Sequence, residues 1–129
     1  MPDTCFCFDE VARLHDFFQG WFRGDLAVDD FTGCETALAA DFSIVTPGGD
    51  LVRRDELLSA LRRHHGKEPR DFAIETVGRR CHQVNDVHLV TYEERQSGPR
   101  STIRLSTAAI TAVGDGFSWH SVHETWVTG

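Results

Sequence analysis

The stretch TIRLSTAAITAVGDGFSWHSVHETWV, from Thr102 to Val127, carries the pattern from which the fold class follows. Two runs rich in β-branched and aromatic residues flank Gly114-Asp115-Gly116, and Asp-Gly between such runs is a strong hairpin signal. The pattern predicts two long antiparallel strands, from Thr102 to Val113 and from Phe117 to Val127. Strands of this length curl rather than lie flat, often through bulges.

Two further β-rich segments precede this hairpin. They extend from Phe72 to Val84 and from Val87 to Gln96, and Asn85-Asp86 joins them as a turn. Four long strands in succession predict an antiparallel meander that fills the second half of the chain.

Helices are predicted in the first half of the chain. Apolar residues recur three and four positions apart between Asp9 and Arg23, which predicts an amphipathic helix. A capping-box spacing predicts a second, short helix from Thr32 to Ala39, and a third helix is predicted from Arg54 to His65. A short strand, Phe42 to Thr46, lies between the second and third helices.

Helices followed by a strand meander are typical of the α+β class, with the helices packed on one face of the sheet. The chain of 129 residues has the length of one domain, residues 1–129. Residues 1–8 are expected to be disordered or loosely attached. A curled sheet with helices across its open side makes a cone, and a cone has a pocket.

Composition narrows the classes of partner. The formal net charge of −7 argues against nucleic acid, because phosphate binding needs a cationic surface. No apolar run approaches the ~20 residues that cross a bilayer, and no signal peptide is recognisable, so a cytoplasmic location without a membrane partner is expected. No cofactor fingerprint is present, and no cofactor is predicted.

No metal site is predicted. Cys5-Phe-Cys7 is too tight for the usual C-x-x-C spacing, and no second pair completes a zinc site. Strict strand alternation places His120 and His123 on opposite faces, and it separates His82 from His88 in the same way.

The register of the last hairpin has two readings. With a two-residue turn at Asp115-Gly116, His123 lies opposite Ala108 and shares a face with Arg104 and Ser106. With a three-residue loop, His123 lies opposite Thr107, and Glu124 joins Arg104 and Ser106 instead. The two-residue turn is favoured, and a slip of one residue re-sorts the faces.

Three patches of this sequence resemble the nuclear transport factor 2-like (NTF2-like) superfamily, in an uncharacterised branch. They are FSIVTPG (Phe42–Gly48) with the following leucine-rich helix, TYEERQ (Thr91–Gln96), and RLSTA (Arg104–Ala108) with HETW (His123–Trp126). The likeness extends from about Val11 to Val127. It implies a cystatin-like cone in which three N-terminal helices pack on a strongly curved, mainly antiparallel sheet. Ketosteroid isomerases, scytalone dehydratase and SnoaL-like polyketide cyclases share this fold.

Three residues are catalytic candidates. His123 could exchange a proton near neutral pH from the wall of the pocket. Tyr92 could donate a hydrogen bond to a carbonyl or enolate, and Glu94 could act as a carboxylate base. Their structural alternatives are a hydrogen-bonded core histidine, a tyrosine at the core edge, and a glutamate–arginine ion pair.

Four further residues are candidates for ligand binding. They are Arg104, Ser106, Thr125 and Trp119. Arg104 could hold an anionic group, unless it pairs with Glu94. Trp119 could stack on a ring-bearing ligand, unless it only packs the core.

Three functions remain open. The first is a domain that binds a small apolar or aromatic molecule without chemistry. The second is a cofactor-free lyase or isomerase that uses His123 as acid and base, and the third is a homodimerisation module. A homodimer is expected because the outer face of an open sheet needs cover, with Trp126 or Val122 in the interface.

Overall fold

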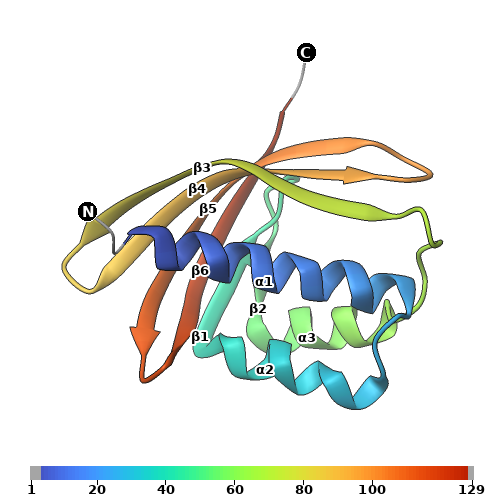
Figure 1. Ribbon diagram of the computed structural model, residues 1–129, viewed down its shortest axis with the longest axis horizontal. Coiled ribbons are helices and arrows are strands. Elements are labelled where there is room, and N and C mark those ends of the chain that lie inside the picture. Colours follow the sequence, from blue (N-terminus) through green and yellow to red (C-terminus); the bar gives the residue numbers. More distant parts are fainter. Residues whose placement is uncertain (1–3, 128–129) are drawn as a thin grey trace.

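A six-stranded sheet bends around the first helix in the computed structural model of the chain, which describes residues 4–127 (Figure 1). The strand order is β2-β1-β6-β5-β4-β3, and every neighbouring pair is antiparallel except β1 with β6. The strands are β1 (Leu38–Val45), β2 (Leu51–Arg53), β3 (Ala73–Val84), β4 (Val87–Ser97), β5 (Thr102–Val113) and β6 (Gly116–Trp126). The predicted α+β class and the mainly antiparallel, curved sheet are confirmed.

All three predicted helices are present on the same side of the sheet (Figure 1). They are α1 (Thr4–Arg23), α2 (Thr32–Ala37), which the 3₁₀ turn η1 (Val28–Phe31) precedes, and α3 (Arg54–Arg63). α1 packs along β3 and β4, while α3 packs on β1 and β2. The short strand β2 was not predicted, since the helix was expected directly after the turn that follows β1.

The start of α1 differs from the expectation. The helix begins at Thr4, five residues before Asp9, and the Cys7 side chain is fully buried. Cys7 is therefore part of the core, and the predicted loose attachment does not hold for it. The expectation for residues 1–3 lies outside the described residues.

Two bulges bend the long strands, as the strand lengths predict. In β3 the register shifts between Val77 and Arg80, where Gly78 has a φ of 64° that suits glycine. In β6 the register shifts because Trp119 pairs with Ile110 while Ser121 pairs with Ala109. His120 is then the extra residue of the bulge, and it lets the strand change its alternation.

The turn of the last hairpin is Gly114-Asp115, not the favoured Asp115-Gly116. Val113 pairs with Gly116, and Gly114 has a φ of 57°. A positive φ at the first central position is what a Gly-first hairpin turn needs, and this explains the difference. Beyond the bulge, His123 pairs with Thr107. The favoured register is therefore wrong by one residue, and the pairing is that of the alternative.

The aromatic stripe of α1 fills the core beneath the sheet. Trp21 is fully buried, and its Nε1 donates a hydrogen bond of 2.7 Å to the carbonyl oxygen of Leu61. The ends of α1 and α3 approach so closely that a Cβ on Gly24 would lie 3.1 Å from the Cα of Gly66. These contacts hold α3 beside α1 and so fix one wall of the interior. No helix among residues 4–127 has the length and apolar character needed to cross a membrane.

Candidate functional site

A cavity of about 340 Å³ lies on the concave side of the sheet, between α1, α3 and the strands. Its walls are mostly apolar, with Phe18, Phe42 and Trp119 among the large side chains. A small number of polar groups project from helix and sheet into this apolar space. They are His15, Tyr92, Glu94, Gln96, Arg104 and Glu124.

Strand alternation gathers most of these groups in neighbouring rows. Tyr92 and Glu94 are two apart on β4, and they pair across the strands with Ser106 and Arg104. Ser106 pairs in turn with Glu124. Paired residues project to the same side of a sheet, so the three strands bring their polar side chains to one end of the cavity.

His15 forms a buried pair with Glu94. Its Nε2 lies 3.1 Å from Glu94 Oε1, and its Nδ1 lies 2.8 Å from the carbonyl oxygen of Val11, to which it donates. Gln96 Nε2 donates 2.7 Å to the other oxygen of Glu94. Both pair members are less than a tenth exposed.

Both ring nitrogens of His15 face acceptor oxygens, an arrangement that favours an imidazolium next to a carboxylate. Burial alone would lower the pKa of His15, but the hydrogen bond and negative charge of Glu94 offset it, and the pKa is raised. Burial alone would raise the pKa of Glu94, but the hydrogen bond and charge of His15 more than offset it, and the pKa is lowered. Both shifts therefore favour the charged form of the pair in an apolar surrounding.

Glu124 is the cavity carboxyl group whose pKa is raised toward neutral pH. Burial, aided by the nearby charge of Glu94, raises the pKa of Glu124 to about 7, although Arg104 opposes the shift. Arg104 Nη1 lies 3.3 Å from Glu124 Oε1, and its guanidinium lies over the Trp126 ring at 4.9 Å. A carboxyl group with this pKa can accept or donate a proton near neutral pH.

Tyr92 is buried between these groups. Its ring meets the His15 ring edge-on at a centroid distance of 5.2 Å. Burial, together with the charges of Glu94 and Glu124, raises the pKa of the Tyr92 hydroxyl well above its ordinary value. The hydroxyl therefore stays protonated and can donate a hydrogen bond.

The structure brings four of the predicted site residues to the cavity: Tyr92, Glu94, Arg104 and Trp119. Ser106 is fully buried behind them. The expected Glu94–arginine pair is absent from the described ion pairs, since Glu94 pairs with His15 and Arg104 pairs with Glu124.

His123 and Thr125 do not reach the cavity. Both side chains are exposed on the outer face of β6. Strict alternation from Trp119 predicted that they face inward, and the bulge at His120 reverses this, so that Trp119, Val122 and Glu124 face inward together. The expectation that the His123 ring points into the pocket is wrong.

The cavity holds polar residues that were not among the site residues predicted from the sequence, among them His15, Gln96 and Glu124. His15 stands within the apolar stripe of α1, three residues before Phe18 and four after Val11, and a polar residue in such a stripe is a signal. Glu124 stands two residues after Val122 on β6, and it was grouped with Arg104 only in the alternative register.

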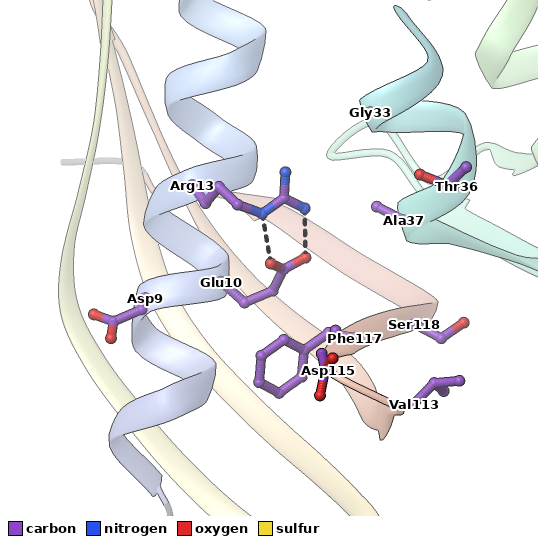
Figure 2. A pocket seen from close by; sticks show the side chains of 11 residues that line it. Asp9, Glu10, Arg13, Gly33, Thr36, Ala37, Val113, Asp115, Phe117 and Ser118 are labelled. Carbon is purple, nitrogen blue, oxygen red and sulfur yellow. Dashed lines mark hydrogen bonds and ion pairs between the residues drawn. The ribbon is translucent and has the colours of Figure 1, made fainter.

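A second, more open hollow lies at the other end of α1, and Figure 2 shows it. Its volume is about 670 Å³. Its buried carboxylate, Glu10, accepts two hydrogen bonds from Arg13, at 2.7 and 2.9 Å, and one from Trp119 Nε1 at 2.8 Å. The buried carboxylate of this groove is already paired and hydrogen-bonded, so the cavity on the concave side is the better candidate site.

A bent sheet with three helices over a half-enclosed cavity defines the cone-shaped α+β class. The chain resembles an NTF2-like protein of unknown function from Pseudomonas aeruginosa, with 28% identity, a TM-score of 0.87, and coverage of 93% of this chain and 97% of that one. The predicted resemblance to the NTF2-like superfamily is therefore confirmed.

Two other neighbours show the fold alone. A candidate dehydratase of the NTF2-like family from Streptomyces avermitilis has a TM-score of 0.72 and 21% identity, with both chains covered in full. A candidate ketosteroid isomerase from Shewanella frigidimarina has a TM-score of 0.67 and 17% identity over 89% of this chain and 90% of that one.

One curated relative is similar in sequence. It is sucrose-phosphatase 1 of Nicotiana tabacum, 30% identical over 131 residues that cover 93% of this chain. The chain spans 30% of the length of that relative. None of the protein-family models matches the chain.

Proposed function

We propose that the cavity binds a small, mainly apolar molecule that carries a carbonyl oxygen, and that Glu124 moves a proton on it without a cofactor. The reaction class is that of an isomerase or lyase. The observation that carries this proposal is a carboxyl group with a pKa of about 7 beside a half-enclosed, largely apolar cavity.

The size and chemistry of the cavity support the binding step. A volume of about 340 Å³ is at the small end of ligand pockets, which hold one small molecule. The faces of Phe18 and Trp119 offer apolar surface to a ring, and the few polar groups at one end would orient it. A small ring-bearing ketone has this combination of features.

Glu124 replaces His123 as the proposed acid and base. Its ionised form would take a proton from the carbon next to the carbonyl group, and the electron pair of that C–H bond would form an enolate. Tyr92, protonated because of its raised pKa, would donate a hydrogen bond to the enolate oxygen. Returning the proton to another carbon completes an isomerisation, whereas loss of a β-hydroxyl as water, with that same proton, completes an elimination.

Glu94 would act through its neighbour. The carboxylate holds His15 charged, and the resulting imidazolium adds positive charge near the place where the enolate develops. We assign Glu94 a positioning role, since both of its oxygens are already hydrogen-bonded, one by His15 and the other by Gln96.

Exchange of deuterium from D₂O into a β,γ-unsaturated cyclic ketone, at the carbon next to the carbonyl group, tests this function. The wild type is expected to exchange the proton next to the carbonyl group, while Glu124→Gln slows exchange by about 10²–10⁴-fold because the amide cannot accept the proton. NMR spectroscopy follows the deuterium, and the rate should rise with pH through about 7. Glu75→Gln, an exposed site on β3, is the matched control.

The outcome separates an enzyme from a binder. Equal exchange rates in the wild type and Glu124→Gln would remove Glu124 as the catalyst. A ketone that binds, as shown by shifts of cavity signals, but does not exchange above the solvent rate would leave a binding domain without chemistry.

We also propose that the outer face of β5 and β6 forms a homodimer interface. Leu105 and Ile103 are 46% and 37% exposed there, next to Thr125, which pairs with Leu105. Neighbouring exposed apolar side chains on a sheet face form a patch of the kind that marks interfaces between proteins. Val122 lines the cavity instead and has no place in this interface, and Trp126 lies at the cavity rim under Arg104.

Leu105→Arg is expected to weaken the dimer at least about 30-fold, which is the effect of losing ~2 kcal/mol at a central contact. Each protomer of a symmetric dimer would bring the same charge to the interface. Sedimentation velocity over a concentration series measures the change. Val28→Arg, equally charged but placed on η1, should leave the association unchanged. A wild type that is monomeric at high concentration would contradict this proposal.

A further inference from the structure

A cluster of two thiols and one imidazole lies outside the cavity, between α1 and the β3-β4 hairpin. Cys7 comes from α1, Cys81 from β3 and His88 from β4. Their ligand atoms all lie within 4.8 Å of one another, and none of the three residues lines the cavity. This cluster has no part in the function proposed above.

The fold assembles the cluster from segments that are far apart in the sequence. Cys81 pairs with Val90, and Gln83 pairs with His88, so Cys81 and His88 are diagonal neighbours on one face of the sheet. α1 packs on this face and brings Cys7 to it. From the sequence, His82 was considered as the metal-binding partner of His88, whereas the structure places Cys81 and Cys7 next to His88.

The imidazole of His88 is buried without a strong hydrogen-bond partner. The side chain is 8% exposed, and within residues 4–127 its ring makes one polar contact, at 3.8 Å from Nδ1 to Cys81 Sγ. Thiols are weak hydrogen-bonding groups, and buried polar groups usually have better partners. A histidine in this position is unusual as a packing residue, and its surroundings suit a metal ligand.

We propose that Cys7, Cys81 and His88 bind a thiophilic cation of the Zn²⁺ class, with water as a fourth ligand. Zinc–sulfur bonds of ~2.3 Å and zinc–nitrogen bonds of ~2.0 Å place tetrahedral ligand atoms about 3.5–3.8 Å apart. The Cys81–His88 separation of 3.8 Å is within about 0.3 Å of the sulfur–nitrogen value, and the remaining separations need contractions of at most about 1.3 Å. Two thiolates and an imidazole select zinc or copper(I) over magnesium or calcium.

The surroundings provide access and a suitable charge. His88 also lines a hollow of about 360 Å³ together with Gln83 and Asp115, so one ligand of the site is reached from outside. Two thiolates would neutralise a divalent cation, so the bound site would carry no net charge in a buried position. Cation binding would displace the thiol protons, so binding should strengthen as pH rises.

Titration of the reduced protein with Co²⁺ tests the site. The wild type is expected to bind one equivalent with the near-ultraviolet absorption of a thiolate–cobalt bond, and Zn²⁺ should displace it. Cys81→Ser and His88→Gln should each weaken binding at least about 100-fold, because even the loss of an outer-shell partner costs 10–100-fold. Cys34→Ser is the matched control, since Cys34 is also a buried thiol with a pKa of about 12 but lies outside the cluster.

Two further variants keep the result decisive. Glu124→Gln should bind Co²⁺ like the wild type, so failure of the function proposed for the cavity and failure of the metal site are distinguishable. Circular dichroism checks whether each variant is folded. If Cys7→Ser is unfolded, the test rests on Cys81→Ser and His88→Gln, because Cys81 is partly exposed and His88 lies on β4. A lack of thiolate–cobalt absorption at millimolar Co²⁺, or unchanged binding by His88→Gln, would overturn the proposal.

Discussion

Replacing Glu94 with leucine is expected to lower the free energy of unfolding by about 3–5 kcal/mol. The change leaves His15 buried without the partner that its Nε2 faces at 3.1 Å, and it also removes the acceptor of Gln96. His15→Leu should cost a similar amount, because it leaves the carboxylate of Glu94 buried without its cation. Urea unfolding monitored by tryptophan fluorescence measures both changes.

The double variant His15→Leu, Glu94→Leu should lose less than the sum of the two single changes. Removing both charges leaves no uncompensated ion, and leucine side chains suit the apolar wall of the cavity. We expect a coupling energy of about 2 kcal/mol or more from the double-mutant cycle. Additive losses would show that the two side chains contribute to stability separately.

His64 and Glu68 form a matched control pair within the same chain. They are also a histidine and a glutamate, 2.9 Å apart, but their side chains are 45% and 27% exposed. Water and salt screen such a pair, so the same cycle at these positions should give a coupling energy below about 1 kcal/mol. The comparison isolates the effect of burial from the chemistry of the pair.

The coupling between His15 and Glu94 should depend on pH in a defined direction. The raised pKa of His15 means that its contribution is complete below the ordinary histidine value and is lost as pH rises through the folded value. The lowered pKa of Glu94 means that its contribution is present above the ordinary glutamate value and is lost as pH falls through the folded value. The coupling is therefore expected to be largest between about pH 4.5 and 6.5.

Glu124→Gln is expected to stabilise the protein increasingly as pH rises. The pKa of Glu124 is raised from 4.5 to about 7, so the folded state binds its proton more tightly than the unfolded state. Stability is then greatest at low pH, falls between about pH 4.5 and 7, and stays low above that range. Glutamine resembles the protonated acid and avoids this loss, while its oxygen can still accept from Arg104.

The expected size of this effect follows from the pKa shift. The advantage of the variant over the wild type should grow by about 2–3 kcal/mol between pH 5 and pH 9, from 1.36 kcal/mol for each pKa unit. Urea unfolding at both pH values measures it, and subtraction removes the pH dependence that His15 gives to both proteins. A difference in stability that is the same at both pH values would refute the raised pKa, while Glu75→Gln on the exposed side of β3 should show no such growth.

Local patterns carried most of the fold. The spacing of apolar residues predicted α1, and turn residues with β-rich runs predicted β3 to β6 within one or two residues of their observed ends. β2 was missed because its three residues, Leu51 to Arg53, are too few to show any period. Local sequence patterns therefore predict long elements well and short ones poorly.

The candidate site was predicted only in part, and one residue explains the error. Of the residues proposed from the sequence, Tyr92, Glu94, Arg104 and Trp119 line the cavity. His123 was placed there wrongly, because alternation was carried unbroken through the bulge at His120. After a bulge, each side chain faces the opposite side from the one that unbroken alternation predicts. The single extra residue His120 therefore turns His123 outward and Glu124 inward, so Glu124 becomes the acid–base candidate.

The sequence by itself determined the class of this protein: three helices, a strand meander long enough to curl, and a resemblance to NTF2-like proteins that nearly the whole chain carries. Only the tertiary structure decided the chemistry of the interior, because it depends on contacts between distant segments. His15 and Glu94 are 79 residues apart, and Cys7 meets Cys81 and His88 only because α1 packs on β3 and β4. Periodicity is a local property, whereas burial and pairing, which set the pKa values of these groups, arise when the sheet closes over the helix.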